Sequence, residues 1–200
     1  MIGEITMKLT IYGFFCLFLA LPALAQKHPA NTQLSAAEFV SLAGRCAPGA
    51  PPDTLLAIAR TESGLQANAI SINRPRGSAK SAGYRDGEIV LSKQPRNPIE
   101  AKRWIRWLGL HHFSVSIGLM QVNAETAGRM GVNPEKLLEP CTNLQVGARI
   151  LIAAYSALAR ELGEGFTALD AALSVYNTGS PTAGFRNGYV ADIYAHAREP

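Results

Sequence analysis

Residues 55–64 read LLAIARTESG, and this short stretch guides the interpretation of the whole chain. Four residues, at i, i+3, i+4 and i+7, would share one face of a helix: Leu55, Ile58, Ala59 and Glu62. Burial on that apolar face would disfavour the charged form of the Glu62 carboxyl and raise its pKa. Such a carboxylic acid can donate a proton near neutral pH. The alternative is a half-solvated glutamate at the end of a short helix.

The chain length is suited to one domain with a sizeable core, because 200 residues remain well above the minimum even without a leader. Its apolar content of 48% is that of a globular protein and argues against wholesale disorder. We expect three parts: a signal peptide at 1–25, a linker at 26–34 and a folded domain at 35–198.

The N-terminus has the pattern of an export signal. Lys8 precedes an apolar run at 9–21, and Ala23-Leu24-Ala25 supplies the small residues of a cleavage site. The run is short for a bilayer span, so we expect cleavage after Ala25, a periplasmic protein and no stable membrane anchor afterwards. The alternatives are an uncleaved anchor and a true start at Met7.

Cysteine usage fits an oxidising compartment. Removal of the leader removes Cys16 and leaves Cys46 and Cys141, a pair that predicts a disulfide in an exported protein. Closing a loop of about 95 residues would destabilise the unfolded chain by about 4 to 5 kcal/mol in the entropy model. Two free buried thiols are the alternative.

The chain has a formal net charge of +4. Its densest basic stretch contains Lys93, Arg96, Lys102, Arg103 and Arg106. Such charge suits an anionic polymer, including cell-wall material, but an exported protein rarely meets nucleic acid, so we expect no nucleic-acid partner. We interpret the stretch as a solvated helix face.

The pattern of periodicity, caps and breakers predicts a mainly α (α+β) domain with a small β-hairpin or flap. Helices are expected at 35–46, 52–63, 97–110, 123–130, from 133, 143–162, 166–176 and 189–197. The alanine-rich helix at 143–162 is expected to be central and buried. Short extended runs at 70–72 and 88–91 are expected to form the flap, since turn residues separate them.

Three separate stretches set amide, hydroxyl or carboxyl groups beside glycine and apolar residues. They are Glu62-Ser63-Gly64, the GLMQVN run at 118–123, and the VYNTG run at 175–179, with Tyr189 downstream. Asn and Gln both donate and accept hydrogen bonds, and Tyr offers an aromatic face and a hydroxyl. Together these groups are typical of a site that binds sugars.

These motifs, in this order, resemble those of the soluble lytic transglycosylases related to goose-type lysozyme, over nearly all of the chain after the leader. The stretch Gln94-Pro95-Arg96-Asn97, followed by Glu100-Ala101, resembles the branch associated with type IV secretion and conjugation machines. Val175 departs from the alanine that relatives commonly carry. Tyr194 is a second candidate for the downstream tyrosine assigned to Tyr189.

The resemblance implies a lysozyme-like fold and an SLT-type catalytic domain at 35–198. The activity it implies is cleavage of the MurNAc-β-1,4-GlcNAc bond of peptidoglycan, with formation of 1,6-anhydro-MurNAc ends. Glu62 would act first as the acid and then as the base. The residues expected to bind or orient substrate are Ser63, Gly118, Leu119, Met120, Gln121, Asn123, Tyr176, Asn177 and Tyr189.

The resemblance also assigns individual roles. Gln121 would bind an N-acetyl group, Asn177 would hold the sugar near the cleaved bond, and Ser63 and Tyr189 would orient the Glu62 carboxyl or an acetamido group. Leu119 and Met120 would form an apolar wall beside Glu62. Helix-end capping is the alternative for Gln121 and Asn177, and core packing is the alternative for Tyr176.

Other functions remain as alternatives. The same fold could serve a hydrolytic muramidase, which needs a second carboxylate, or a non-catalytic peptidoglycan-binding assembly factor. Glu125 follows the Gln121 motif but belongs to a polar turn. We expect no cofactor and no metal, because His111 and His112 are adjacent and their side chains would diverge on a helix.

Overall fold

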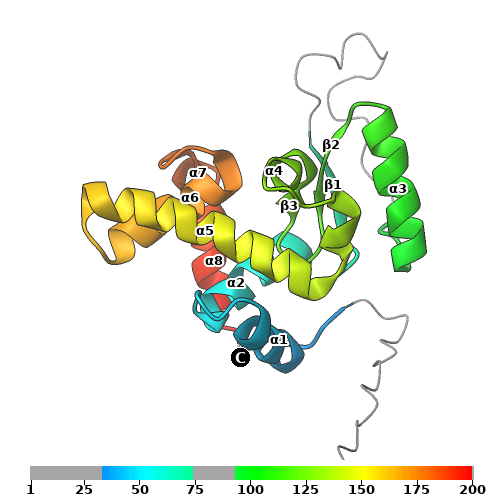
Figure 1. Cartoon of the computed structure of the whole chain (residues 1–200). Helices are drawn as coiled ribbons and strands as arrows, with labels where there is room; N and C mark the ends of the chain where they lie inside the picture. Colours follow the sequence, from blue (N-terminus) through cyan, green and yellow to red (C-terminus); the bar gives the residue numbers. More distant parts are fainter. Residues whose placement is uncertain (1–32, 74–92, 200) are drawn as a thin grey trace, which may run out of the picture.

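The computed structural model describes residues 33–73 and 93–199. These residues form a mainly helical domain with a small antiparallel sheet, which confirms the expected fold class (Figure 1). The helices are α1 Ala36–Cys46, α2 Pro52–Ser63, α3 Pro98–Leu110, α4 Ala124–Arg129, the 3-10 helix η1 Pro134–Leu138, α5 Pro140–Leu162, α6 Phe166–Thr178, α7 Ala183–Arg186 and α8 Tyr189–Ala197. The strands are β1 Ile70–Asn73, β2 Ser114–Ile117 and β3 Val122–Asn123.

Local sequence signals account for the ends of the helices that carry the motifs. Ser35 and Glu38 form the predicted capping box of α1. Asn97 and Asn123 cap α3 and α4 through their side-chain oxygens. Gly64 ends α2 in the left-handed conformation, with φ at 58°, which fixes Glu62 in the last turn of that helix.

The sheet is built from segments far apart in the sequence. β1 pairs antiparallel with β2, with Ile70 opposite Ile117, and β2 pairs antiparallel with β3, with Ser116 opposite Asn123. The expected strand at 70–72 is therefore confirmed. Its described partner is β2, which the sequence pattern did not indicate as a strand, and the second expected run at 88–91 lies outside the described residues. The expected signal peptide and most of the linker also lie outside them.

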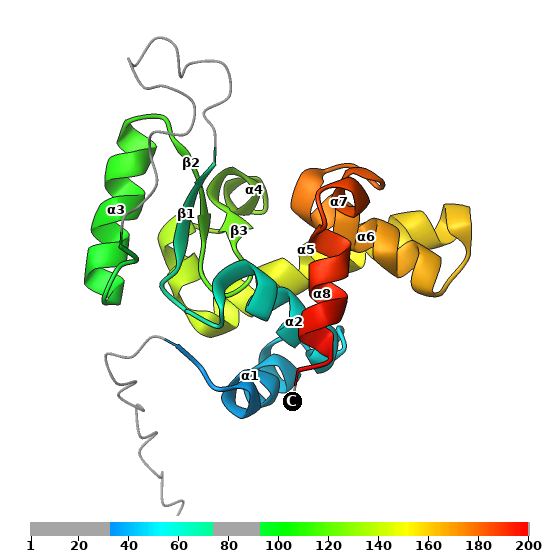
Figure 2. The same ribbon diagram turned by 180° about the vertical axis from the view of Figure 1, so that it is seen from behind.

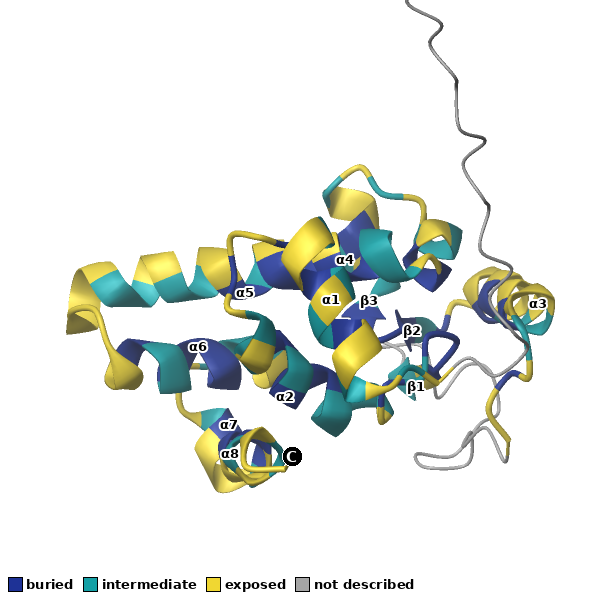
Figure 3. Cartoon of the chain, turned by 90° about the horizontal axis from the view of Figure 1, so that it is seen from below, coloured by how far each residue is buried: buried dark blue, intermediate teal, exposed yellow. Residues whose placement is uncertain are grey.

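The helix α5 crosses the molecule, and only its N-terminal half is buried. Asn143, Leu144, Gly147 and Leu151 belong to that buried half. The C-terminal half is mostly exposed, and Leu162 at its end is 50% exposed (Figure 3). The expectation of a central, buried helix thus holds for the N-terminal half, whereas the C-terminal half is only partly buried, because α6 packs along it while one side stays open to solvent.

A disulfide joins the end of α1 to the start of α5. It links Cys46 to Cys141, whose Cα atoms lie 5.3 Å apart, and confirms the predicted pairing. It closes a loop that contains α2, the sheet and α3. Figure 2 shows α8 beside α2. Within the described ranges, no helix has both the length and the apolarity needed to cross a bilayer.

Candidate active site

A cavity of about 390 Å³ lies where α2, the sheet, α4, α5 and α6 meet. Its lining is mostly polar and comprises Glu62, Ser71, Asn73, Ser116, Gln121, Val122, Asn123, Thr126, Ile150, Tyr176 and Asn177. Among these described lining residues, Glu62 is the only acid. The cavity therefore brings together residues from all three motifs around one carboxyl group.

Glu62 lies at the cavity end of the predicted apolar face. Leu55, Ile58 and Ala59 are fully buried on that face, and Glu62 itself is half-buried. Burial raises the pKa of its carboxyl from 4.5 to about 7, and a hydrogen bond from Tyr189 opposes part of this rise. The alternative of a glutamate at the end of a helix is correct as to position, since Glu62 is the penultimate residue of α2.

Tyr189 reaches Glu62 from α8. Its hydroxyl donates to Glu62 Oε1 at 2.6 Å, and the residue is buried. Burial first, and then the negative charge of Glu62, raises the pKa of Tyr189 well above its usual range, so the phenol remains a donor. Tyr194, the other candidate, instead donates to Asp170 on α6, at 2.5 Å.

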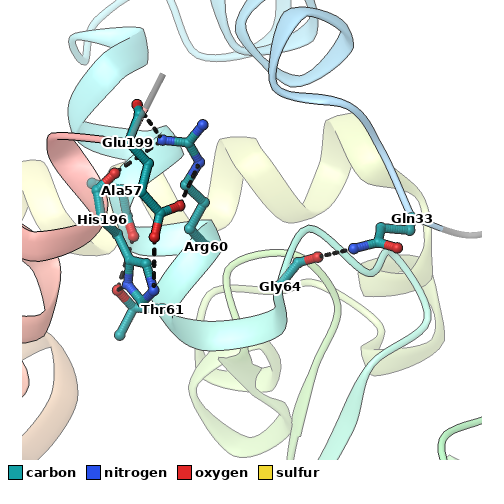
Figure 4. A network of polar contacts seen from close by, with 7 residues as sticks. All are labelled: Gln33, Ala57, Arg60, Thr61, Gly64, His196 and Glu199. Atoms are coloured by element: carbon teal, nitrogen blue, oxygen red, sulfur yellow. Dashed lines mark hydrogen bonds and ion pairs between the residues drawn. The ribbon is translucent and has the colours of Figure 1, made fainter.

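A polar cluster clamps α8 against α2 and so positions Tyr189 (Figure 4). Arg60 Nη1 donates to the backbone oxygens of His196 and Glu199, each at 2.9 Å. The neighbouring Thr61 hydroxyl lies 2.8 Å from His196 Nδ1. Arg60 and Thr61 directly precede Glu62. The same turn of α2 therefore carries both the Glu62 carboxyl and the contacts that hold α8, the helix that contains Tyr189.

Tyr176 is half-buried and lines the cavity. Its hydroxyl donates to the Met120 carbonyl at 2.8 Å. Burial first, and then the charge of Glu62, raises the pKa of Tyr176 well above its usual value. The alternative interpretation of Tyr176, as a residue of the core, is thus partly supported. Its side chain also links α6 to the turn between β2 and β3.

The turn at 118–121 supports the cavity from behind. Gly118 has φ at 78°, and a side chain there would collide with Asn143 and with the Leu137 carbonyl. Gly118, Leu119 and Met120 are all buried, so the structure places them beneath the cavity lining, whereas we expected them to contact substrate. Their close packing under the sheet explains the difference.

Asn143 on α5 holds this turn, and no sequence signal indicated that role. It is fully buried; its Oδ1 accepts from the Met120 N–H at 2.7 Å, and its Nδ2 donates to the carbonyls of Ile117 and Leu137 at 2.8 and 2.9 Å. The side chain therefore satisfies three backbone groups that the turn would otherwise leave unpaired.

Gln121 lines the cavity with its side chain already engaged. Its Nε2 donates to the carbonyls of Ala69 and Gly118 at 3.1 and 2.9 Å, and its Oε1 accepts from the Ser71 hydroxyl at 2.6 Å. Both amide hydrogens are thus used within the protein. In this arrangement the side chain offers a ligand only the remaining acceptor capacity of its oxygen.

Ser63 lies away from the Glu62 carboxyl. Its hydroxyl contacts the carbonyl oxygens of Ala59 at 3.0 Å and Leu119 at 2.8 Å. We expected Ser63 to orient the carboxyl or a ligand; in the structure its hydroxyl faces the backbone, because of the helical direction at the end of α2. It fastens α2 to the supporting turn instead.

Asn123 combines a cavity position with helix capping. Its Oδ1 accepts from the N–H groups of Glu125 and Thr126 at 3.0 and 3.2 Å, and its Nδ2 donates to Ser114 at 2.8 Å. Glu125 is exposed and does not line the cavity. Its carboxyl is therefore poorly placed to act as a partner to Glu62.

Asn177 is the exposed member of the set, at the end of α6. Its Oδ1 accepts from Asn187 Nδ2 at 3.0 Å. Within the described part of the chain, its own amide hydrogens have no protein partner. Asn177 therefore differs from Gln121, since its donors remain available at the rim of the cavity.

Four polar residues of the lining were missed by sequence reasoning: Ser71, Asn73, Ser116 and Thr126. The alternation along β1 was an available signal, since Ser71 and Asn73 share one face of a strand whose other face carries Ile70 and Ile72.

Among the described residues, no cluster of three or more His, Cys, Asp or Glu is arranged to hold a metal ion.

Comparisons with known proteins show which family the chain resembles. Residues 40–192 match the model of the transglycosylase SLT domain. Protein virB1 of Agrobacterium fabrum (strain C58 / ATCC 33970) is 32% identical over 83% of this chain and 62% of its own length. Type IV secretion system protein virB1 of Brucella abortus (strain 2308) is 32% identical over 80% of this chain and 63% of its own length. The chain thus spans less than two thirds of these relatives, and no solved structure matches it.

Proposed function

Because the chain belongs to the transglycosylase SLT domain family, we propose that it cleaves the β-1,4 bond between N-acetylmuramic acid and N-acetylglucosamine in peptidoglycan without adding water. One observation carries the proposal: a half-buried carboxyl, Glu62, lines a polar cavity with a pKa of about 7 and one oxygen bound to Tyr189. Such a group is protonated in about half of the molecules at neutral pH, which suits an acid that must later act as a base.

In the first step, protonated Glu62 gives its proton to the glycosidic oxygen as the bond from that oxygen to the muramoyl C1 breaks. The N-acetylglucosamine part leaves with a hydroxyl group. In the second step, the muramoyl 6-hydroxyl attacks C1, the new O6–C1 bond closes the 1,6-anhydro ring, and the carboxylate of Glu62 takes the hydroxyl proton. The carboxyl is thereby returned to its starting state, and one residue serves both steps.

Tyr189 is proposed to position this carboxyl. Its hydrogen bond favours the charged form of Glu62, which forms after the first proton transfer. The bond also occupies Oε1, so that Oε2 is the oxygen left to face the glycosidic bond. The clamp formed by Arg60 and Thr61 with the C-terminal end of α8 would keep this geometry fixed.

Substrate binding is proposed to involve the polar lining of the cavity. Asn177 would donate to the sugar beside the cleaved bond, since its amide hydrogens are free of protein partners in the described residues. Gln121 would accept from an N-acetyl N–H through Oε1, because its own donors are already used. Asn123 and Tyr176 would border the same sugars, and Ser71 would hold Gln121 in place.

A hydrolytic muramidase is the competing chemistry. An inverting hydrolase needs a second carboxylate at a set distance to activate water, and Glu62 is the only acid in the described lining. The masses of the fragments from purified peptidoglycan distinguish the two reactions. We expect muramoyl ends that lack one water; ends that have gained one water would overturn the cyclising reaction.

We further propose that the enzyme works in the periplasm, with a signal peptide at 1–25 and a catalytic domain at 35–198, and opens the wall for a type IV secretion or conjugation machine. The name of the Brucella relatives supports this setting, since it assigns those proteins to a type IV secretion system. A Glu62→Gln chain should be exported but should fail to restore transport in cells that lack the enzyme. Full restoration would contradict the role of wall cleavage.

A further inference from the structure

The outward face of α3 carries an aromatic groove apart from the cavity that contains Glu62. The groove has a volume of about 450 Å³ and is lined by Glu100, Arg103, Trp104 and Trp107. These two tryptophans are the only ones in the chain. The opposite face of α3 is apolar and buried through Ala101, Ile105 and Leu108, and these residues attach the helix together with the partly buried Trp104.

The two indoles form a rigid corner. Their rings lie 6.2 Å apart between centroids and are inclined by 82°. His111 stacks on Trp107 at 4.1 Å and 25°, and its Nδ1 lies 2.7 Å from the Trp107 carbonyl. His111 follows Trp107 by one turn, and Arg103 precedes it by one turn. Phe113 also lies nearly parallel to the Trp107 ring, at 6.3 Å and 15°. Trp107 remains 41% exposed.

The α3 surface around the groove carries more cations than anions, although the groove lining itself contains one of each, Arg103 and Glu100, which interact electrostatically. Arg106 is paired with Glu135 and Arg96 with Glu100, but Lys102 and Arg103 form no ion pair within the described ranges. Both of these side chains are exposed. A ligand in the groove would therefore meet an aromatic surface beside the guanidinium group of Arg103 and the carboxylate of Glu100. The excess of cations on this surface, Lys102 and Arg103 among them, would favour a ligand that carries carboxylates.

The groove is remote from the cavity in the fold. In both views α3 lies beyond the three-stranded sheet, on the side away from α6, α7 and α8 (Figures 1 and 2). No residue is shared between the linings of the groove and of the cavity. A molecule bound at α3 would thus leave the cavity around Glu62 accessible.

We propose that this groove is a second glycan-binding site, which holds a peptidoglycan strand away from the bond that is cut. The apolar face of a pyranose ring would stack on Trp107 against the wall made by Trp104. A carboxylate of the attached peptide would pair with Arg103. The identity of the ligand rests on the proposed function, whereas the second site itself depends only on α3.

A glycan fits these observations better than a protein does. A stable protein interface buries about 800 Å² on each side, with a central apolar patch, whereas this groove is short and bounded by two indoles and two charged side chains. A sugar with a nearby carboxylate matches both its size and its charge. A second site of this kind would keep the enzyme on an insoluble polymer between cleavage events.

The tryptophan emission of the chain reports on this groove alone, because both tryptophans lie in it. We expect a saturable change in emission when soluble peptidoglycan fragments with intact peptides are titrated into the Glu62→Gln chain, which prevents turnover. Arg103→Ala should weaken this binding severalfold and leave binding of a neutral chitin oligosaccharide unchanged. Calorimetric binding without any change in emission would overturn the proposal.

Binding to purified cell-wall sacculi gives the second readout. In the Glu62→Gln background, Trp107→Ala should reduce the bound fraction severalfold, whereas the matched control Leu110→Ala, an exposed apolar residue on the same helix, should bind as the parent does. With Glu62 intact, Trp107→Ala should cleave short soluble glycans at the normal rate. Unchanged binding to sacculi would overturn the glycan site and would favour a protein as the ligand of the α3 groove.

The two proposals fail in different ways. Loss of sacculus binding in the Trp107→Ala chain, with cleavage products intact, supports the second site. If the unaltered chain bound sacculi through Trp107 but released no anhydro-ended fragments, the proposed reaction would fall and the second site would stand.

Discussion

The two sides of the cavity treat their polar groups in opposite ways. On the side of α2 and α8, Glu62 is half-buried, and burial destabilises its anion by more than the hydrogen bond from Tyr189 stabilises it. On the side of the sheet, Gln121 uses both of its amide hydrogens within the protein, and Asn123 caps α4 and donates to Ser114. The reactive carboxyl therefore lies where solvation of its charge is incomplete, whereas the shape of the cavity is fixed where polar side chains are hydrogen-bonded within the protein.

This contrast predicts very different costs for removing a group from each side. A change at Glu62 should remove chemistry without harming the fold, whereas a change in the groups behind the sheet should damage the fold and only thereby the chemistry. The predictions below test this contrast, from the largest expected effect to the smallest.

Replacement of Glu62 by Gln should lower the cleavage rate by at least about 10³-fold, because the same carboxyl donates and recovers the proton. The rate of release of soluble fragments from purified peptidoglycan measures this loss. Glu125→Gln is the matched control, since Glu125 is exposed and lies outside the cavity lining. Equal losses in the two variants would break the assignment of the chemistry to one carboxyl.

Replacement of Asn143 by Ala should destabilise the fold by about 4 kcal/mol, because three buried backbone groups would lose their partners. Urea unfolding, followed by circular dichroism, measures the change in the free energy of unfolding. Asn133→Ala is the matched control, because Asn133 caps the exposed start of η1 and should cost only about 1 kcal/mol. Similar costs for both would show that the supporting turn does not depend on Asn143.

Glu62 should also make stability fall as pH rises. Its folded pKa of about 7 exceeds the ordinary value of 4.5, so the folded state binds more protons than the unfolded state between these values. The amide that replaces the carboxyl in a Glu62→Gln variant does not titrate, so the unaltered chain should match the variant below pH 4.5 and be less stable by about 3 kcal/mol above pH 7. Melting curves across this range test the difference, and a constant offset would contradict it.

Removal of the Tyr189 hydroxyl should move the pH profile. Tyr189→Phe deletes a hydrogen bond that lowers the pKa of Glu62, so this pKa should rise further. If the bond stabilises the carboxylate by about 1.4 kcal/mol, the rise is roughly one pH unit. The alkaline limb of kcat/KM should shift upward by that amount, and the rate should fall about tenfold. Tyr194→Phe, on the same helix but bound to Asp170, should leave the limb in place.

The sequence predicted well those features that depend on neighbouring residues. The apolar face that ends at Glu62, the capping box at Ser35 and the break at Gly64 are all local, and the structure contains each of them. The disulfide between Cys46 and Cys141 was predicted because these two cysteines remain after removal of the leader and exported proteins meet an oxidising compartment. Tyr189 was chosen over Tyr194 by resemblance, and its contact with Glu62 supports that choice.

Features that depend on distant contacts could not be predicted in this way. Asn143 resembles any polar residue near the start of a helix, and its role arises only because α5 passes beneath the turn at 118–121. Ser63 stands beside Glu62 in sequence, but the direction of the last helical turn sends its hydroxyl to the backbone. The pairing of β1 with β2 spans about 40 residues, and no local pattern indicated it.

The protonation of Glu62 is the point on which the account depends, and a direct titration measures it. With carbon-13 at the glutamate side-chain carboxyls, the Glu62 signal can be assigned by its absence from the Glu62→Gln variant and followed by NMR from pH 4 to pH 9. We predict a midpoint near pH 7, well above the ordinary glutamate value of 4.5. A midpoint near 4.5 would mean that the carboxyl is solvated as an ordinary anion, and it would contradict the proposed proton transfer.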